Sequence, residues 1–540
     1  MKKIFITIIA ILLPLVSNAD DSGKCGDNMT YTYESATKTL TISGTGAMYD
    51  YTDTNRPWKY SVKHVVVNEG VTTIGKNAFH WFSEIVSVKI PSTIIKIGEY
   101  AFGGCLALSS VRISDLESWC CINFVGKNAN PLTYSGRLFV DDVEIKDLVI
   151  PNIIKNIKDF AFSGANGLKS VTIPDGVTSI GECAFCYCSG LTSLTIPNSV
   201  TSIDHDAFWN CTGLNSVNLS ENLTCLELNL FADCSSLTYI SIPDKVTSIN
   251  SGAFAGCSSL ESIMIPSKVS FIGSSAFSSC ISLSSIVIPN SVKTIEMSAF
   301  SGCYKLVSVT LPNNITELSE FLFAGCKSLT DVTIPSTVSN IAKGAFRYCS
   351  GLKSIVIPGS VKNIGDLAFE GTNLSYVISQ ILNPNPFNGK ANKNNTIIGI
   401  HSFYNTILYV PVGTIDKYKG TEGWSGFAYI EEKNTDDGIQ QCAKPTISFE
   451  NGKLHFGCET DGVRFVYNII TDKSGLDFGN NVEMPLTVTI AVYATKIGYN
   501  NSEVTTTNLA ITRTLGDLNY DGEVNAADHV RLSNIILNIE

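Results

Sequence analysis

Long apolar stretches and clustered positive charge are both missing from this sequence. No run of about 18 consecutive apolar residues occurs, which is the length a helix needs to cross a bilayer. Lys and Arg are not clustered, and the formal net charge is −11 at pH 7. Phosphate binding needs concentrated positive charge. We therefore expect no transmembrane segment in the mature chain and no nucleic-acid partner.

Enzyme motifs are also missing. The sequence has no G-x-S-x-G elbow, no phosphate-binding loop and no paired-carboxylate signature. Nucleophilic catalysis by histidine requires neighbouring Ser or Cys and Asp side chains. The six histidines are instead scattered over the chain: His64, His80, His205, His401, His455 and His529. We expect the protein not to be an enzyme.

The first 19 residues have the features of a secretory signal peptide. Lys2 and Lys3 precede a predominantly apolar stretch over residues 4–13, and small residues end at Ala19. This order of charged, apolar and small residues is the export pattern. The prediction is a signal peptide over residues 1–19 and a secreted protein at a bacterial cell surface.

A repeat of 23 residues dominates the sequence. Its most regular mark is a phenylalanine, usually preceded by alanine, which we call the column phenylalanine. The same spacing separates an earlier pair, Phe79 and Phe102. The regular column consists of Phe162, Phe185, Phe208, Phe231, Phe254, Phe277, Phe300, Phe323, Phe346 and Phe369. A fixed period in the twenties predicts a leucine-rich-repeat solenoid.

Each repeat carries apolar residues that it cannot bury alone. In residues 167–190, Leu168, Val171 and Ile173 have the L-x-x-L-x-L spacing of a repeat strand, and Phe185 follows as an inward-pointing wedge. Each buried aliphatic side chain contributes roughly 1.5–3 kcal/mol. Stability is therefore expected to come from stacking of neighbouring repeats.

The unit Leu-x-Ser-Val-x-Ile-Pro-x-x-Val-x-x-Ile-Gly-x-x-Ala-Phe-x-x-Cys resembles the BspA-type leucine-rich repeat. The resemblance implies repeats over residues 59–378, with an irregular repeat at 103–161, an N-terminal cap at 20–58 and a C-terminal cap at 379–430. Caps are needed because open solenoid ends expose apolar edges and unpaired backbone. For function, the resemblance implies an adhesin that binds a protein or glycan on a host or bacterial surface.

Nine cysteines form a second column, three residues after the column phenylalanine. They are Cys105, Cys188, Cys211, Cys234, Cys257, Cys280, Cys303, Cys326 and Cys349. We predict small buried residues at these positions, with a thiol or metal stripe as the alternative. Cys183, Cys186 and Cys188 form a C-x-x-C-x-C motif that leaves redox chemistry or zinc open. Pairing of Cys442 with Cys458 is a further possibility.

The residues on either side of the middle apolar position of each strand are expected to face outward. They form two columns: Ser170, Ser193, Ser216, Tyr239, Ser262, Ser285, Ser308, Asp331 and Ser354; and Thr172, Thr195, Asn218, Ser241, Met264, Val287, Thr310, Thr333 and Val356. This hydroxyl-rich face suits recognition of a protein or glycan, although Ser and Thr are also ordinary solvent-facing residues. Tyr239, Met264 and Asp331 depart from the pattern and are our candidate ligand-contact residues.

Different segments follow the repeats. Residues 431–443 are polar and predict a linker, and residues 444–513 alternate in hydropathy as a small β-sandwich does. Residues 514–540 contain D-x-N-x-D-G, in which Gly522 provides the turn of a calcium loop. The expected calcium ligands are Asp517, Asn519, Asp521, Glu523 through its main-chain carbonyl, Asn525 and Asp528.

This loop and the helix expected after it resemble a dockerin, although a dockerin has two such loops and this chain has one. The resemblance implies a cohesin-like partner. It also provides the alternative function: a non-catalytic, dockerin-attached component of an extracellular polysaccharide-degrading assembly. The predicted fold is thus a capped leucine-rich-repeat solenoid, a small β-sandwich and an EF-hand-type loop-helix that binds calcium.

Overall fold

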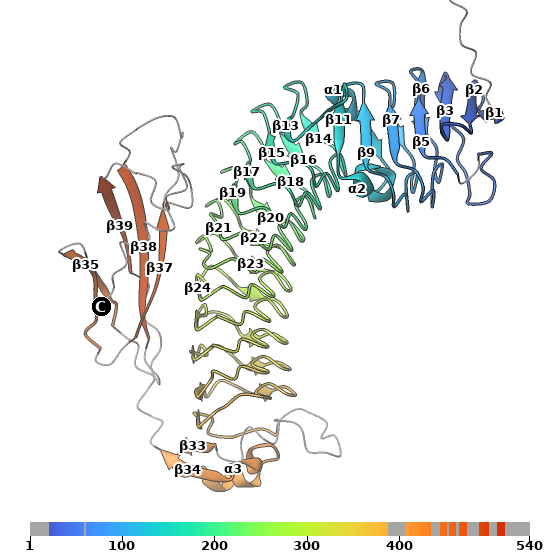
Figure 1. Cartoon of the computed structure of the whole chain (residues 1–540). Helices are drawn as coiled ribbons and strands as arrows, with labels where there is room; N and C mark the ends of the chain where they lie inside the picture. Colours follow the sequence, from blue (N-terminus) through green and yellow to red (C-terminus); the bar gives the residue numbers. More distant parts are fainter. Residues whose placement is uncertain are drawn as a thin grey trace, which may run out of the picture. The chain divides into compact units, whose positions relative to one another are not determined.

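The computed structural model describes residues 21–58, 61–386, 406–433, 443–450, 453–460, 464–471, 485–495 and 505–512 (Figure 1). The chain divides into two compact units, one formed by Met1–Ile145 with Lys158–Gly167 and the other by Lys146–Ile157 with Leu168–Glu540. The predicted signal peptide, the calcium loop and Cys442 lie outside the described residues. They stay predictions.

The first unit is built on two sheets. The longer one pairs, in order, β1 (Asp21–Gly26), β2 (Met29–Glu34), β3 (Thr39–Gly44), β5 (His64–Val67), β7 (Ser87–Ile90), β9 (Ser110–Ile113), β11 (Leu138–Val140) and β12 (Val143–Glu144). The shorter one contains β4 (Gly46–Ala47), β6 (Val71–Ile74), β8 (Lys96–Ile97) and β10 (Asn123–Phe124). From β3 to β11 the pairing is parallel, as stacked coils require.

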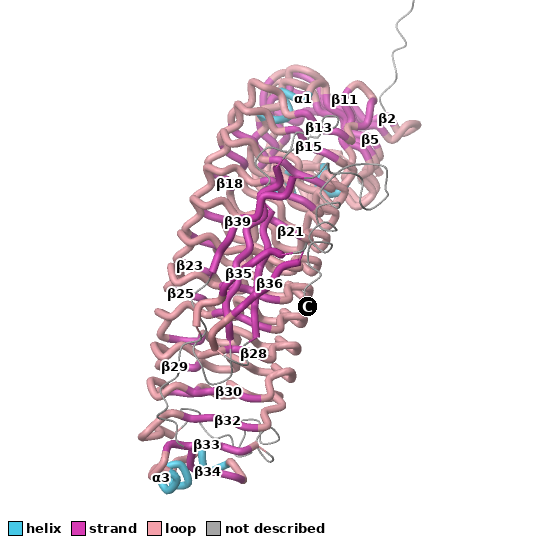
Figure 2. The backbone as a smooth tube through the Cα atoms, turned by 90° about the vertical axis from the view of Figure 1, so that its left-hand side faces the viewer, coloured by secondary structure: helices cyan, strands magenta, loops and turns pink. Residues whose placement is uncertain are grey.

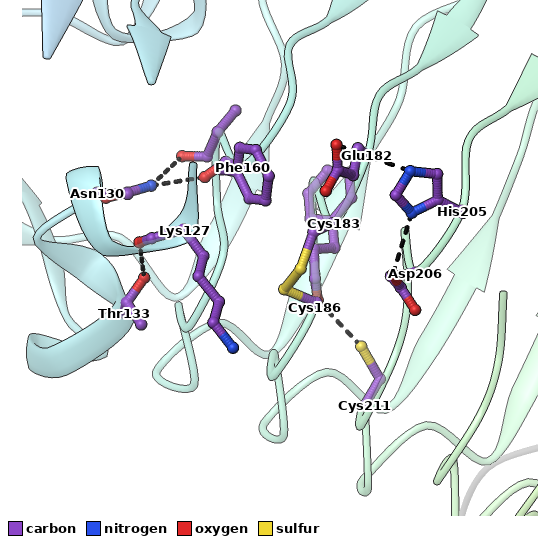
Figure 3. Close-up of a disulfide and its surroundings, with 12 residues drawn as sticks. Lys127, Asn130, Thr133, Phe160, Glu182, Cys183, Cys186, His205, Asp206 and Cys211 are labelled. Atoms are coloured by element: carbon purple, nitrogen blue, oxygen red, sulfur yellow. Dashed lines mark hydrogen bonds and ion pairs between the residues drawn. A yellow bond between two sulfur atoms is a disulfide. The ribbon is translucent and has the colours of Figure 1, made fainter. Parts of the chain in front are cut away.

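Short helices replace a regular turn where the 23-residue spacing is lost. They are α1 (Leu116–Cys121), the 3-10 turn η1 (Lys127–Ala129) and α2 (Leu132–Ser135). Asn130 has no exposed surface. Its Nδ2 donates to the carbonyl oxygens of Phe160 at 2.6 Å and Ala161 at 3.1 Å, and its Oδ1 accepts from the amide of Leu132 at 2.9 Å (Figure 3). One amide side chain thus fastens this irregular segment to the turn at Phe160.

The second unit repeats a coil with one strand on each of two faces. The first face carries β13 (Asp147–Val149), β15 (Ser170–Thr172), β17 (Ser193–Thr195), β19 (Ser216–Asn218), β21 (Tyr239–Ile240), β24 (Ser285–Val287), β26 (Ser308–Thr310), β28 (Asp331–Val332), β30 (Ser354–Ile357), β32 (Tyr376–Ser379), β33 (Ile407–Pro411) and β34 (Tyr429–Lys433). The second carries β14 (Asn156–Ile157), β16 (Ser179–Ile180), β18 (Ser202–Ile203), β20 (Cys225–Leu226), β22 (Ser248–Ile249), β23 (Phe271–Ile272), β25 (Thr294–Ile295), β27 (Glu317–Leu318), β29 (Asn340–Ile341) and β31 (Asn363–Ile364).

Within each face the strands pair in parallel, and Figure 2 shows them as short bands joined by loops. The register equals the sequence period, because Ser193 pairs with Ser216 and Leu194 with Val217. The predicted leucine-rich-repeat solenoid is confirmed.

The column phenylalanines form a continuous stack in the core. Phe254 has no exposed surface, and its ring centroid lies 5.9 Å from that of Phe231 and 5.4 Å from that of Phe277. The same stacked geometry continues from Phe185 to Phe369. This aromatic stack is formed by the inward-pointing wedges that the sequence predicted.

Each turn holds two residues with left-handed backbone, two positions before and two positions after the column phenylalanine. At Phe185 these are Cys183, with φ of 52°, and Tyr187, with φ of 62°. Because of this backbone geometry, the amides of every second residue point along the stack. Cys183, Phe185 and Tyr187 donate to carbonyl oxygens in the next repeat, those of His205, Ala207 and Trp209. We call these hydrogen bonds the turn ladder. It joins repeats independently of the strands.

The chain after the solenoid contains a helix and further strands. Near β33 and β34 lie α3 (Ile415–Gly420) and the 3-10 turn η2 (Trp424–Gly426). Beyond them, β35 (Thr446–Glu450) and β36 (Lys453–Gly457) pair as a hairpin, and β37 (Arg464–Thr471), β38 (Pro485–Thr495) and β39 (Thr505–Thr512) form an antiparallel sheet. These strands agree with the all-β segment expected at 444–513, and the sandwich arrangement stays a prediction.

Candidate binding surfaces

The first strand face of the second unit alternates as the sequence predicted, except at Ser308, which was expected to face outward but is only 5% exposed. In β17, Leu194 is 3% exposed, while Ser193 and Thr195 on either side of it are exposed. Neighbouring strands repeat this pattern at the same register, so hydroxyl-bearing side chains line up from coil to coil.

The candidate contact residues lie on this face but not all together. Tyr239 begins β21 and pairs with Ser216 of β19, and Met264 of the following coil is 37% exposed. The backbone of Asp331 lies in β28, paired with Ser308. Tyr239 and Asp331 are four repeats apart, which at about 4.8 Å per strand corresponds to roughly 19 Å. Adjacent coils therefore carry Tyr239 and Met264, and Asp331 belongs to a separate part of the face.

Met264 also marks an interruption of the strand ladder. Residues 262–264 have no strand geometry between β21 and β24. The coil is still held by backbone bonds from Glu261 to Thr238 and from Ser284 to Glu261, each at 3.2 Å. A long, unbranched side chain is thus displayed at a local irregularity, which the sequence period alone did not reveal.

The cysteine column is buried as predicted, and its thiols have a further role. The Sγ of Cys257 donates to the carbonyl oxygen of Phe231 in the preceding repeat at 3.1 Å. That oxygen also accepts from the amide of Cys234 at 3.1 Å. The same Sγ contact occurs at Cys105, Cys211, Cys234, Cys280, Cys303, Cys326 and Cys349. The column therefore supplies donors as well as apolar volume.

The C-x-x-C-x-C motif separates into two kinds of cysteine. Cys183 and Cys186 form a disulfide with a Cα–Cα distance of 4.8 Å (Figure 3). Cys188 is a buried thiol of the column outside this disulfide. Among the residues that the structure describes, no group of three His, Cys, Asp or Glu side chains could hold a metal ion. The disulfide cross-links two residues of one turn.

Thiol reactivity in the folded protein should distinguish the buried cysteine column from an exposed cysteine. Burial raises the pKa of the thiols of Cys105 and Cys211 to about 12, so almost no reactive thiolate forms at pH 8. Cys121 is exposed. We expect iodoacetamide at pH 8 to label Cys121 in the folded protein and the column only after unfolding, as checked by peptide mass spectrometry. Rapid labelling of the column in folded protein would contradict its burial.

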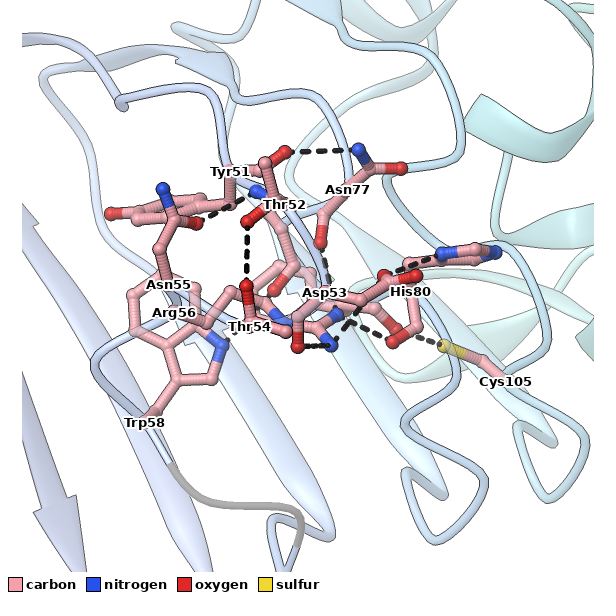
Figure 4. Close-up of polar contacts among 12 residues, drawn as sticks. Tyr51, Thr52, Asp53, Thr54, Asn55, Arg56, Trp58, Asn77, His80 and Cys105 are labelled. Atoms are coloured by element: carbon pink, nitrogen blue, oxygen red, sulfur yellow. Dashed lines mark hydrogen bonds and ion pairs between the residues drawn. The ribbon is translucent and has the colours of Figure 1, made fainter.

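A polar network in the first unit was not singled out from the sequence. Arg56, whose side chain is 3% exposed, donates to the carbonyl oxygens of Asn77, His80 and Asp53. His80 Nδ1 lies 2.8 Å from Asp53 Oδ1 (Figure 4). The network fixes the loop before Trp58 onto the turn that carries His80. Its members Asp53, Arg56 and His80 do not recur one period later, so the repeat pattern did not indicate it.

Comparison with known families agrees with this repeat geometry. The model of the BspA type leucine rich repeat region matches in six copies, over residues 58–122, 135–261, 179–303 and 270–408. The chain belongs to the BspA-type leucine-rich-repeat family. This fold is typical of non-enzymatic interaction proteins. No curated protein matches the chain.

Solved structures with similar folds come from several bacteria. A leucine-rich repeat protein from Bacteroides ovatus is 24% identical, covers 76% of this BspA-type chain and 99% of its own, and has a TM-score of 0.43. One from Eubacterium ventriosum is 23% identical, with coverages of 69% and 99% and a TM-score of 0.44. A leucine rich cell surface protein from Faecalibacterium prausnitzii is 24% identical, with coverages of 71% and 98% and a TM-score of 0.39.

The helices in the described part of this BspA-type protein have at most six residues. None of its helices there combines the length and apolar character needed to cross a bilayer.

Proposed function

We propose that this BspA-type protein is a secreted, non-catalytic adhesin that binds a protein or glycan on a host or bacterial surface. The binding surface is the first strand face of the second unit. The observation that carries this proposal is the outward display of mostly uncharged side chains on parallel strands, interrupted at Tyr239 and Met264, which lie on adjacent coils. A rigid, low-charge surface of this kind suits extended recognition, with larger side chains as its anchors.

Family membership supports the same conclusion. Solenoid repeats present long continuous surfaces because every coil contacts only its neighbours. Such surfaces are used for recognition more readily than for catalysis, which needs convergent groups in a concave site. Localisation at the cell surface is part of this proposal, and it rests on the export pattern of residues 1–19.

The C-terminal calcium loop favours a second candidate function. This second proposal rests on the residues from Asp517 to Asp528, which place oxygen ligands at the positions of an EF-hand-type loop. In this alternative, calcium orders the dockerin-like segment, which attaches the protein to a polysaccharide-degrading assembly, and the repeats are carried as a non-catalytic component. The two proposals differ in which end of the chain makes the essential contact.

Capture experiments test the two ends separately. The mature chain is used to capture partners from the surface of the producing bacterium and from host matrix, with calcium or with chelator. A Tyr239→Ser, Met264→Thr double variant restores the residue types typical of the two columns. Neither side chain is buried, so folding should be retained. We expect affinity for the captured partner to fall at least roughly tenfold.

The matched variant alters only the calcium loop. Asp517→Ala removes its first oxygen ligand, and calorimetry should then show no calcium binding by the full chain. If the adhesin proposal is correct, capture persists in this variant and in chelator but is weakened in the double variant. Capture that is lost in Asp517→Ala and retained in the double variant would overturn the adhesin proposal and support attachment through the tail.

A further inference from the structure

Three aromatic rings of the first unit gather at one turn, and two of them are largely exposed. Trp81 is 59% exposed and Tyr100 is 39% exposed. The ring of His80 lies between them, with centroids 5.3 Å from Trp81 and 5.4 Å from Tyr100. An exposed cluster of large apolar side chains is informative, because folding alone favours burying it.

The backbone beneath these rings is strained. Trp81 has φ of 61° and Tyr100 has φ of 55°, a left-handed conformation that bulky residues rarely adopt. Trp81 occupies the position two residues after the column phenylalanine. Glycine, which adopts this conformation without strain, occupies it in several repeats: Gly104, Gly164, Gly256, Gly302, Gly325 and Gly371. Tyr187 and Tyr348 hold the same position with positive φ, so this geometry is a property of the turn and fixes the direction in which the Trp81 side chain leaves the backbone.

Two glycines of the next repeat form the seat for the rings. A Cβ on Gly104 would lie 2.5 Å from Cε3 of Trp81, and a Cβ on Gly103 would lie 2.8 Å from Cδ2 of His80. Neither distance is compatible with a side chain, so the rings rest directly on backbone. Because Gly104 covers one side of the Trp81 ring, the exposed surface of the ring is on the opposite side. The result is a fixed aromatic platform, which we call the Trp81 platform.

Charged side chains near the platform occur in pairs. The Asp53 side chain is 53% exposed and is held by His80 and Arg56 (Figure 4). The nearest exposed cation in sequence, Lys76, is paired with Glu99 at 2.6 Å. These groups therefore offer little net charge, which favours a neutral ligand over a charged one.

We propose that the Trp81 platform binds a neutral glycan built of β-linked glucopyranose units. All ring hydroxyls of this sugar are equatorial, so each face presents only C–H groups, which pack against an indole. The equatorial hydroxyls point outward, where the Asp53 carboxylate can accept a hydrogen bond. This site lies on turns of the first unit and uses none of the strand-face residues in the proposed adhesin surface.

Calorimetry of the full chain with cellohexaose tests the platform. We expect saturable binding of cellohexaose and none of trigalacturonate, whose carboxylates would find the nearby cations already paired. Binding should also blue-shift tryptophan fluorescence, since Trp81 is largely exposed, whereas Trp58, Trp119 and Trp424 are buried and Trp209 is half-buried. This shift should be absent in Trp81→Gly. Absence of cellohexaose binding, or equal binding of trigalacturonate, would overturn the proposal.

Trp81→Gly distinguishes binding from folding. We expect affinity for cellohexaose to fall at least roughly tenfold. The melting temperature should change by less than roughly 3 °C, because glycine relieves the left-handed backbone while the lost ring was mostly exposed. Unchanged affinity in this variant would refute the platform.

Tyr348→Gly is the matched control. Tyr348 occupies the same turn position with φ of 59°, but the Arg347 guanidinium covers its ring at 4.7 Å. We expect this variant to bind cellohexaose as the unmodified protein does. The Tyr239→Ser, Met264→Thr variant should do the same, so failure of the adhesin proposal and failure of the platform give different results.

Discussion

Replacing Phe254 with alanine should lower the free energy of unfolding by about 3–5 kcal/mol. The side chain has no exposed surface and stacks between Phe231 and Phe277 at 5.9 and 5.4 Å. Alanine would leave a cavity that two flanking rings, each fixed by the next one in the stack, cannot fill. Denaturant unfolding followed by circular dichroism measures the loss.

Phe271→Ala provides the control for this substitution. Phe271 is the same residue type in β23 of the same unit, but it lies outside the stack and is half-buried. Its replacement should destabilise the protein much less than replacement of Phe254. Similar losses for the two variants would show that the aromatic stack contributes no more than ordinary contacts do.

Asn130→Asp should be comparably damaging, with a loss of about 3 kcal/mol or more at pH 7. The Nδ2 group that donates to the carbonyls of Phe160 and Ala161 would become a carboxylate oxygen facing two acceptors, at a site without exposed surface. Burial beside acceptors raises the pKa of the new carboxyl group in the folded state. The neutral form can donate one of the lost bonds.

The sign of the pH effect follows from this raised pKa. The variant is least destabilised below the pKa of an unfolded aspartate, about 3.9, and stability falls as pH rises through the higher pKa of the folded state. Thermal unfolding at pH 4 and pH 7 therefore tests the assignment, and the difference between variant and unmodified protein should be larger at pH 7. Asn128→Asp is the control, because Asn128 only accepts a bond, from Tyr134 at 3.0 Å.

The repeated features of the fold were predictable because each is specified many times. The spacing of the column phenylalanines gave the register that pairs Ser193 with Ser216, and the apolar spacing gave the inward position of Leu194. When a pattern recurs at a fixed period, all copies of a position are expected to share one environment, whether in a strand, in the core or at the surface. The outward position of Met264 followed from the same periodicity.

The features that were not predicted depend on single copies or on backbone conformation. The disulfide between Cys183 and Cys186 occurs in one turn, whereas residue types as different as Trp81 and Ser279 share the left-handed geometry of Cys183 in other turns. Arg56 and Asn130 act through contacts outside the period, to carbonyls 21 or more residues away. The calcium ligands, from Asp517 to Asp528, stay a prediction because they lie outside the described residues.

The turn ladder gives the solenoid a mechanical property. Neighbouring coils of the second unit are joined by turn amides such as those of Phe231 and Asp233, and at many junctions also by strand pairs on two faces, as from β15 to β17 and from β16 to β18. A pull along the stack at such a junction is shared among three rows of hydrogen bonds. The junction separates only when all three rows break together.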